Sequence, residues 1–123
     1  MSKLNHANLP VADVASLRDF FVQQFDFTVL NTRGENAFAV LRGTDGFILN
    51  IMRDRNDSGF PENFHVGFFL DSPDDVRAKH DQMQAANLAP GPIEELNRGG
   101  WKSLTFYCRA PNNILVEVGA GLS

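Results

Sequence analysis

The chain has 123 residues, enough for one domain with a hydrophobic core but too few for two independent domains. Its 11 Lys and Arg residues against 15 Asp and Glu residues give a net charge of -4, so no basic field attracts nucleic acid or anionic lipid. No stretch approaches the roughly 18 uninterrupted apolar residues of a membrane span, and the N-terminus lacks the basic start and apolar run of a signal peptide. We therefore expect a soluble, cytoplasmic protein whose partner is a small molecule or another protein.

The first half of the chain is predicted to begin with a strand at 3–11 and a helix at 15–25. Asp13 is a natural N-cap, because its side chain can accept hydrogen bonds from the free N–H groups of a first helical turn. Apolar residues then recur with the spacing of an α-helix: Leu17, Phe20, Phe21 and Phe25. Three more strands are expected in this half, at 27–32, 36–43 and 46–53.

The second half follows a polar linker, DRNDSGFPEN at 54–63. A strand is expected at 63–70 and a helix at 73–86, with Ser72 as its N-cap and Pro73 at the first helical position. The remaining strands are predicted at 90–95, 102–109 and 114–119.

Comparison of the sequence with itself shows that the two halves are repeats. The segment HANLPVAD at 6–13 aligns with HVGFFLDS at 65–72, and FAVLRGTDGFILNIM at 38–52 aligns with TFYCRAPNNILVEV at 105–118. The second half carries extra residues at 89–101, which we interpret as a mobile loop.

The repeat predicts an α+β fold class, with two βαβββ modules in tandem at 1–56 and 60–123. Neither module alone could bury its sheet face, so we expect a single domain over 1–123.

Four positions are equivalent in the repeat, and they are filled by His6, Asn50, His65 and Glu117. Because side chains alternate across a strand, these four could point into one cavity if the halves are related by a pseudo-twofold axis. Two neutral imidazoles and one carboxylate hold a divalent ion while leaving coordination positions free for water or substrate. The sequence therefore predicts a metal site formed by His6, His65 and Glu117.

Each of these residues also has a structural interpretation. Either histidine alone is more often a hydrogen-bonded polar residue than a ligand. The carboxylate of Glu117, enclosed by apolar residues, would also be stabilised on an exposed strand face or by an arginine partner such as Arg42 or Arg109.

Six residues are candidates for contact with a substrate: Asn8, Asn50, Trp101, Thr105, Tyr107 and Arg109. Trp101 follows a Gly-Gly pair and is either a lid residue or a packing anchor. Thr105, Tyr107 and Arg109 share one face of a strand. His80 lies mid-helix and is interpreted as structural, and no residue stands out as a catalytic acid or base.

Two counts bear on assembly and covalent structure. The single cysteine, Cys108, cannot form an internal disulfide. The 11 phenylalanines must be hidden in a core or an oligomer interface, so a dimer is expected.

Three segments give the chain a resemblance to the vicinal oxygen chelate superfamily, which includes glyoxalase I, fosfomycin-resistance thiol transferases, extradiol dioxygenases and bleomycin-resistance proteins. They are LNHANLPVADVASLRDFF at 4–21, FHVGFFLDSPDDVRAKHDQMQAANL at 64–88 and FYCRAPNNILVEV at 106–118. The resemblance implies a curved mixed sheet around a metal-site cavity, with His6, His65 and Glu117 at the usual ligand positions. It also implies a homodimer in which His6 from one subunit joins His65 and Glu117 of the other.

The sequence departs from the glyoxalase I pattern at Asn50, where such enzymes carry a glutamate that is both ligand and base. An amide cannot take a proton at neutral pH, which argues against glyoxalase I activity. Thr105 with Tyr107 loosely matches a Ser/Tyr pair of the fosfomycin-resistance transferases, and the turn at 111–113 reads PNN, with Asn113 expected in the left-handed conformation.

The expected function is a metal-dependent enzyme that chelates neighbouring oxygens of a small substrate to one divalent ion, Fe, Mn, Zn or Ni. Dioxygenase-like cleavage and thiol addition to an electrophile rank equally, and isomerisation ranks third. The alternative is a metal-free protein of the bleomycin-resistance type that sequesters a drug or other ligand.

Overall fold

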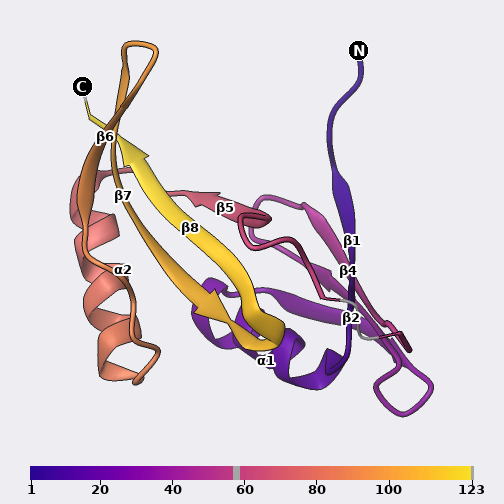
Figure 1. Ribbon diagram of the computed structural model, residues 1–123. Helices are drawn as coiled ribbons and strands as arrows, with labels where there is room; N and C mark the ends of the chain where they lie inside the picture. The colour runs from indigo at the N-terminus through magenta and orange to yellow at the C-terminus, as the bar shows by residue number, and fades with distance from the viewer. Residues whose placement is uncertain (57–58, 123) are drawn as a thin grey trace. The chain divides into compact units, whose positions relative to one another are not determined.

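The computed structural model describes residues 1–56 and 59–122 (Figure 1). The chain divides into two compact units, Met1–Gly59 and Phe60–Ser123, and each unit has the predicted order of a strand, a helix and three strands. The α+β class and the tandem arrangement are thus confirmed. That the units form one domain, with a curved sheet around a metal-site cavity, remains a prediction.

The first unit is a four-stranded mixed sheet with one helix. Its elements are β1 (His6–Val11), α1 (Val14–Phe25), β2 (Thr28–Arg33), β3 (Phe38–Arg42) and β4 (Ile48–Arg53). The strand order is β1-β4-β3-β2, and β1 runs parallel to β4 while the other pairs are antiparallel. Asp13 caps α1 as predicted, its side chain accepting from the Ser16 N–H at 3.2 Å.

The core of the first unit lies between α1 and one face of this sheet. The helix contributes Leu17, Phe20, Phe21 and Phe25, which are the predicted apolar stripe, and all four are buried. Alternate residues of the strands meet them: Leu9, Val11, Ala39, Leu41, Leu49 and Ile51. The opposite sheet face therefore carries the intervening side chains, including those of His6, Asn8 and Asn50.

The second unit repeats this plan. Its elements are β5 (His65–Phe69), α2 (Pro73–Ala85), β6 (Glu94–Arg98), β7 (Trp101–Ala110), a short 3-10 turn (Pro111–Asn113) and β8 (Ile114–Gly121). The strand order is β5-β8-β7-β6, with β5 parallel to β8 and the other pairs antiparallel. Ser72 caps α2 by accepting from the Asp75 N–H at 3.2 Å, and Pro73 opens the helix, both as predicted.

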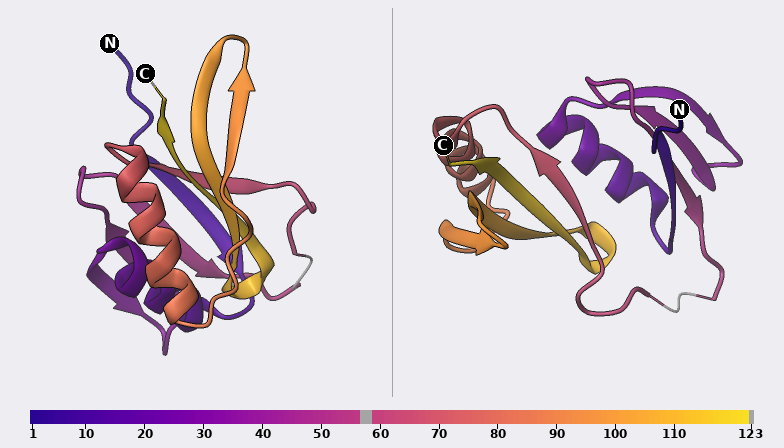
Figure 2. Two further views of the ribbon diagram at one scale, coloured as in Figure 1. Left: turned by 90° about the vertical axis from the view of Figure 1, so that its left-hand side faces the viewer. Right: turned by 90° about the horizontal axis from the view of Figure 1, so that it is seen from above.

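Helix α2 covers one face of the second sheet, as Figure 2 shows. Its Val76 and Met83 are buried together with alternate residues of β7 and β8: Leu104, Phe106, Cys108, Ala110, Ile114, Val116, Val118 and Ala120. The Phe106 ring meets the His80 ring edge-on at 5.0 Å, which identifies this as the helix side of the sheet. The residues of β7 and β8 that alternate with this buried set face away from α2.

Two predictions concern residues 89–101: a mobile loop over the whole segment and a strand at 90–95. A strand is present, but it lies at residues 94–98 (β6), so the loop prediction is wrong for these residues. Glu and Asn have low strand propensity, but β6 is an edge strand whose backbone pairs with β7 over its whole length. The turn that joins them is Gly99-Gly100, with φ of 62° and 89°. Two residues at positive φ are typical of a tight type I′ hairpin, so this Gly-Gly pair was the signal for the strand.

Three smaller expectations can be compared with the structure. Asn113 is left-handed as predicted (φ 59°), and so is Asn112 (φ 64°). The linker expected at 54–63 includes residues 57–58, which lie outside the described residues. Neither helix of the described part has the length and apolar composition to cross a membrane.

The close fit between β7 and β8 predicts that Gly119→Ala destabilises the protein. A Cβ at position 119 would lie 2.9 Å from Thr105 Oγ1, and Thr105 is buried, with its hydroxyl held at 2.8 Å from that of Ser103. We expect a loss of about 1–3 kcal/mol in the free energy of unfolding, measured by urea denaturation, because a crowded interior must shift to admit the methyl group.

Gly67→Ala is the matched control for this prediction. Gly67 also lies in a strand of the second sheet, but its added Cβ would come no closer than 3.9 Å to any neighbour. Equal stability of the two variants would show that the contact with Thr105 is not the cause.

The burial of Cys108 predicts a protected thiol. Burial raises the pKa of this thiol, and Sγ lies 3.3 Å from the Leu88 carbonyl oxygen, to which it can donate. Because the thiolate is the reactive form, we expect the folded protein to react with Ellman's reagent at least about tenfold more slowly than the unfolded chain at the same pH. Equal rates would contradict this prediction.

Candidate functional site

Polar side chains gather on the face of the second sheet that points away from α2. Gly67 and Tyr107 are the register partners of Glu117 on either side, and His65 is the partner of Leu115. Because side chains alternate, His65, Tyr107 and Glu117 all project from this face. The repeat analysis thus placed His65 and Glu117 on the correct side of neighbouring strands.

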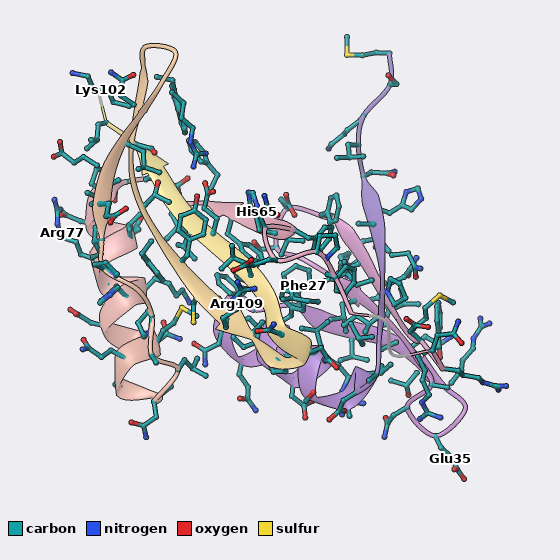
Figure 3. All side chains as sticks on the ribbon, in the orientation of Figure 1. Phe27, Glu35, His65, Arg77, Lys102 and Arg109 are labelled. Atoms are coloured by element: carbon teal, nitrogen blue, oxygen red, sulfur yellow. The ribbon has the colours of Figure 1, made fainter. Side chains whose placement is uncertain are left out.

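His65, labelled in Figure 3, is oriented by a backbone carbonyl just before β5. Its Nδ1 lies 3.0 Å from the carbonyl oxygen of Asn63, and a carbonyl oxygen can only accept, so Nδ1 carries the proton. In the neutral imidazole, Nε2 therefore holds the free lone pair. This Nε2 lies 3.5 Å from Glu117 Oε1, and the Glu117 side chain is only 18% exposed.

Tyr107 holds the carboxylate from the neighbouring strand. Its hydroxyl donates to Glu117 Oε1 at 2.7 Å. Partial burial, followed by this hydrogen bond, raises the pKa of Tyr107 above its ordinary value, so the phenol is neutral at physiological pH. Tyr107 is therefore a fixed neutral donor to Glu117.

Arg98, at the end of β6, joins this network, and the sequence reasoning did not identify it. Its guanidinium donates to the Tyr107 hydroxyl at 2.9 Å and lies 3.4 Å and 3.5 Å from the two carboxylate oxygens of Glu117. The hydrogen bond to Tyr107, then that to Glu117, raises the pKa of Arg98. The sequence suggested Arg42 or Arg109 as an arginine partner of Glu117. Within the second unit an arginine does approach Glu117, but it is Arg98, whereas Arg109 donates to backbone carbonyl oxygens.

The remaining predicted contact residues of this unit have different surroundings. Thr105 is buried against Ser103, and Arg109 donates to the carbonyl oxygens of Asn113 at 3.0 Å and Glu62 at 3.3 Å. Trp101 is 47% exposed, and its ring lies 5.4 Å from that of Phe69, which is 67% exposed. The contacts of these three residues with a substrate remain predictions.

The first unit presents its predicted residues on an equivalent sheet face. Asn8 and Asn50 are register partners on β1 and β4, and Asn8 Nδ2 lies 3.1 Å from Met52 Sδ. His6 Nδ1 lies 2.7 Å from the Asn5 amide oxygen, so Nε2 keeps its lone pair as in His65. The two histidines thus have matching oxygen contacts at Nδ1.

The geometry of the second unit fits two ligands of a metal ion. Neighbouring ligand atoms on one ion, each bonded at the usual length near 2 Å, lie roughly 3.0–3.5 Å apart. The 3.5 Å between His65 Nε2 and Glu117 Oε1 meets this spacing. A backbone acceptor on the second ring nitrogen is also the usual way to orient a ligating histidine.

The third predicted ligand, His6, belongs to the first unit. Within residues 1–56 and 59–122, no three His, Cys, Asp or Glu side chains are grouped closely enough to hold a metal ion. The structure thus brings together His65 and Glu117, while the set that includes His6 remains a prediction.

His80 is held by contacts within its own unit. Its Nε2 lies 2.9 Å from the Gly91 carbonyl oxygen, and its ring packs on Phe106. These contacts agree with the structural interpretation, because they join α2 to the segment that precedes β6.

A model of the Glyoxalase/Bleomycin resistance protein/Dioxygenase superfamily matches residues 3–118. A search of curated protein sequences finds no significant match.

Several solved structures resemble the whole chain. A possible glyoxalase from Bacillus cereus is 36% identical, with a TM-score of 0.82 over 96% of this chain and 98% of that one. The fosfomycin resistance protein FosX from Listeria monocytogenes is 21% identical, with a TM-score of 0.74 over 99% and 95% of the two chains. A lactoylglutathione lyase from Agrobacterium tumefaciens is 18% identical, with a TM-score of 0.72 over 98% and 94%.

The last two structures, at 21% and 18% identity, show a likeness of fold alone. The family is shown by the family model, which matches nearly the whole sequence. The chain therefore belongs to the Glyoxalase/Bleomycin resistance protein/Dioxygenase superfamily.

Proposed function

We propose that the protein is a metal-dependent enzyme that coordinates neighbouring oxygens of a small substrate to one divalent ion. The observation that carries this proposal is the lone pair of His65 Nε2 facing Glu117 Oε1 at 3.5 Å. Two electron-rich atoms in that position call for a positive charge between them or a proton on the imidazole. A divalent ion satisfies both atoms at once, and His6 would be the third ligand.

A divalent ion held there supplies Lewis acidity toward oxygens that gain negative charge during a reaction. The protein's own groups prepare the site for it. Tyr107 fixes the rotamer of Glu117, and the Asn63 carbonyl fixes the plane and tautomer of His65. Asn50 supplies an amide where a carboxylate base would be needed for glyoxalase I chemistry, so cleavage with oxygen and thiol addition are the preferred reaction classes.

Metal content provides the direct test. We expect protein purified without chelators to carry about one Fe, Mn, Zn or Ni ion per chain by elemental analysis, as a three-ligand site with high affinity requires. His65→Ala and Glu117→Gln should each lower this to a background level. His6→Ala should do the same if it is the third ligand.

His80→Ala is the matched control, because it removes an imidazole from the same unit that makes structural contacts. It should retain the metal. Equal metal in the wild type, His65→Ala and Glu117→Gln would overturn the proposed ligands.

We further propose that the protein is a homodimer whose sites are shared between subunits. In this arrangement His6 of one subunit completes the site of His65 and Glu117 in the other. It is supported by the family and by the division of the candidate ligands, with His6 in one unit and the other two in the second.

Mixed dimers test the shared site. His6→Ala and Glu117→Gln should each bind no metal alone, but unfolding and refolding them together should restore one intact site in each mixed dimer. We expect about a quarter of the wild-type metal from equal mixing, since half of the dimers are then mixed and each has one of two sites. No recovery in dimers shown to be mixed by mass spectrometry would mean that each site is formed within one chain.

Two observations favour the rival function, a metal-free protein that binds a drug or other ligand. Glu117 already has Tyr107 and Arg98 as partners, so its charge is satisfied without a metal. The same face carries the exposed aromatic pair Phe69 and Trp101, which suits a flat apolar ligand. Wild-type protein that binds no added divalent metal would favour this function.

A further inference from the structure

We propose that Arg98 is a built-in competitor of the metal ion for Glu117, so that metal binding requires the guanidinium to leave the carboxylate. This inference rests on the proposed function and assigns a role to a residue outside the ligand set. It makes Arg98 a residue that sets the metal affinity of the site.

The contacts of Arg98 show what a metal would have to replace. The guanidinium spans both carboxylate oxygens of Glu117, with Nη2 at 3.4 Å from Oε1 and Nη1 at 3.5 Å from Oε2. Oε1 is also the oxygen that lies 3.5 Å from His65 Nε2. The guanidinium of Arg98 therefore contacts the same carboxylate oxygen, Oε1, that would bind the metal.

The guanidinium and a divalent metal ion cannot both bind the Glu117 carboxylate without weakening each other's binding. A guanidinium and a divalent ion on one carboxylate repel each other, and the Glu117 side chain is mostly buried, which limits the screening of that repulsion by water. Tyr107 can stay in place, because it is a neutral donor to Oε1. Arg98 is the partner that must move.

Arg98 has the freedom to leave. Its side chain is 51% exposed, and it lies at the last position of edge strand β6, next to the Gly99-Gly100 turn. It keeps the carboxylate neutralised in the absence of metal, and once displaced it leaves a free guanidinium beside the loaded site. Because binding of each cation weakens binding of the other, removal of Arg98 should raise the metal affinity.

The test is a calorimetric titration of Zn²⁺ into the full-length protein after the metal has been removed with EDTA and the EDTA dialysed away. Arg98→Gln should bind Zn²⁺ about tenfold more tightly than the wild type, within the usual range for two coupled ligands. The stability of the metal-free protein should change in the other direction. In thermal unfolding with EDTA present, Arg98→Gln should be less stable than the wild type, because Glu117 has lost its counter-charge. A merely structural arginine would lower stability without raising the affinity.

Arg77→Gln is the matched control. It removes an arginine from the same unit with the same change in net charge, and Arg77 pairs with Asp74 at 2.8 Å on the outer side of α2 (Figure 3). Its affinity for Zn²⁺ should equal that of the wild type. An equal increase in both variants would assign the effect to net charge and would overturn the proposal.

Two outcomes separate this inference from the function on which it rests. If the wild type and Arg98→Gln bind Zn²⁺ equally and Glu117→Gln does not bind it, the site is real and the role of Arg98 is wrong. If none of the proteins binds Zn²⁺, the proposed metal-dependent function fails, and the inference fails with it.

Discussion

The side chain of Glu117 is the constraint on which the candidate site depends. A carboxylate that is mostly buried loses much of its hydration, so neighbouring groups must stabilise its charge. Three residues from three different strands approach Glu117: Tyr107 from β7, Arg98 from β6 and His65 from β5. The order β5-β8-β7-β6 makes this possible, since β8 lies between β5 and β7 and Glu117 is therefore close to residues of both strands.

The negative charge of Glu117 can be neutralised by a metal ion or by an arginine, and the site has residues that suit each of them. The His65 imidazole is held with its lone pair toward the carboxylate, which suits a metal. The Arg98 guanidinium provides the positive charge that suits the metal-free protein. The two proposed functions therefore differ in which cation holds Glu117, and the affinity for metal decides between them.

Much of the fold could be predicted from the sequence, because local signals and the repeat agree. The caps Asp13 and Ser72 and the apolar stripe of α1 are short-range features, and each is confirmed. The alignment of the halves also predicted that His65 and Glu117 lie on one face, since the period of a strand fixes the side of each residue. Arg98 could not be found in this way, because it has no counterpart in the first half and belongs to the segment interpreted as a loop.

The two units differ in the polar residue that their last strand carries and in the groups around it. In both units the last strand lies between two neighbours, and the central residue of that strand is Asn50 in one and Glu117 in the other. An amide needs no counter-charge, and the first unit has a neutral contact, Asn8 to Met52, beside it. The carboxylate of Glu117 at the equivalent position does need a counter-charge, and Arg98 of the β6–β7 hairpin lies beside it. The β6–β7 hairpin thus supplies, beside Glu117, a positive charge from Arg98.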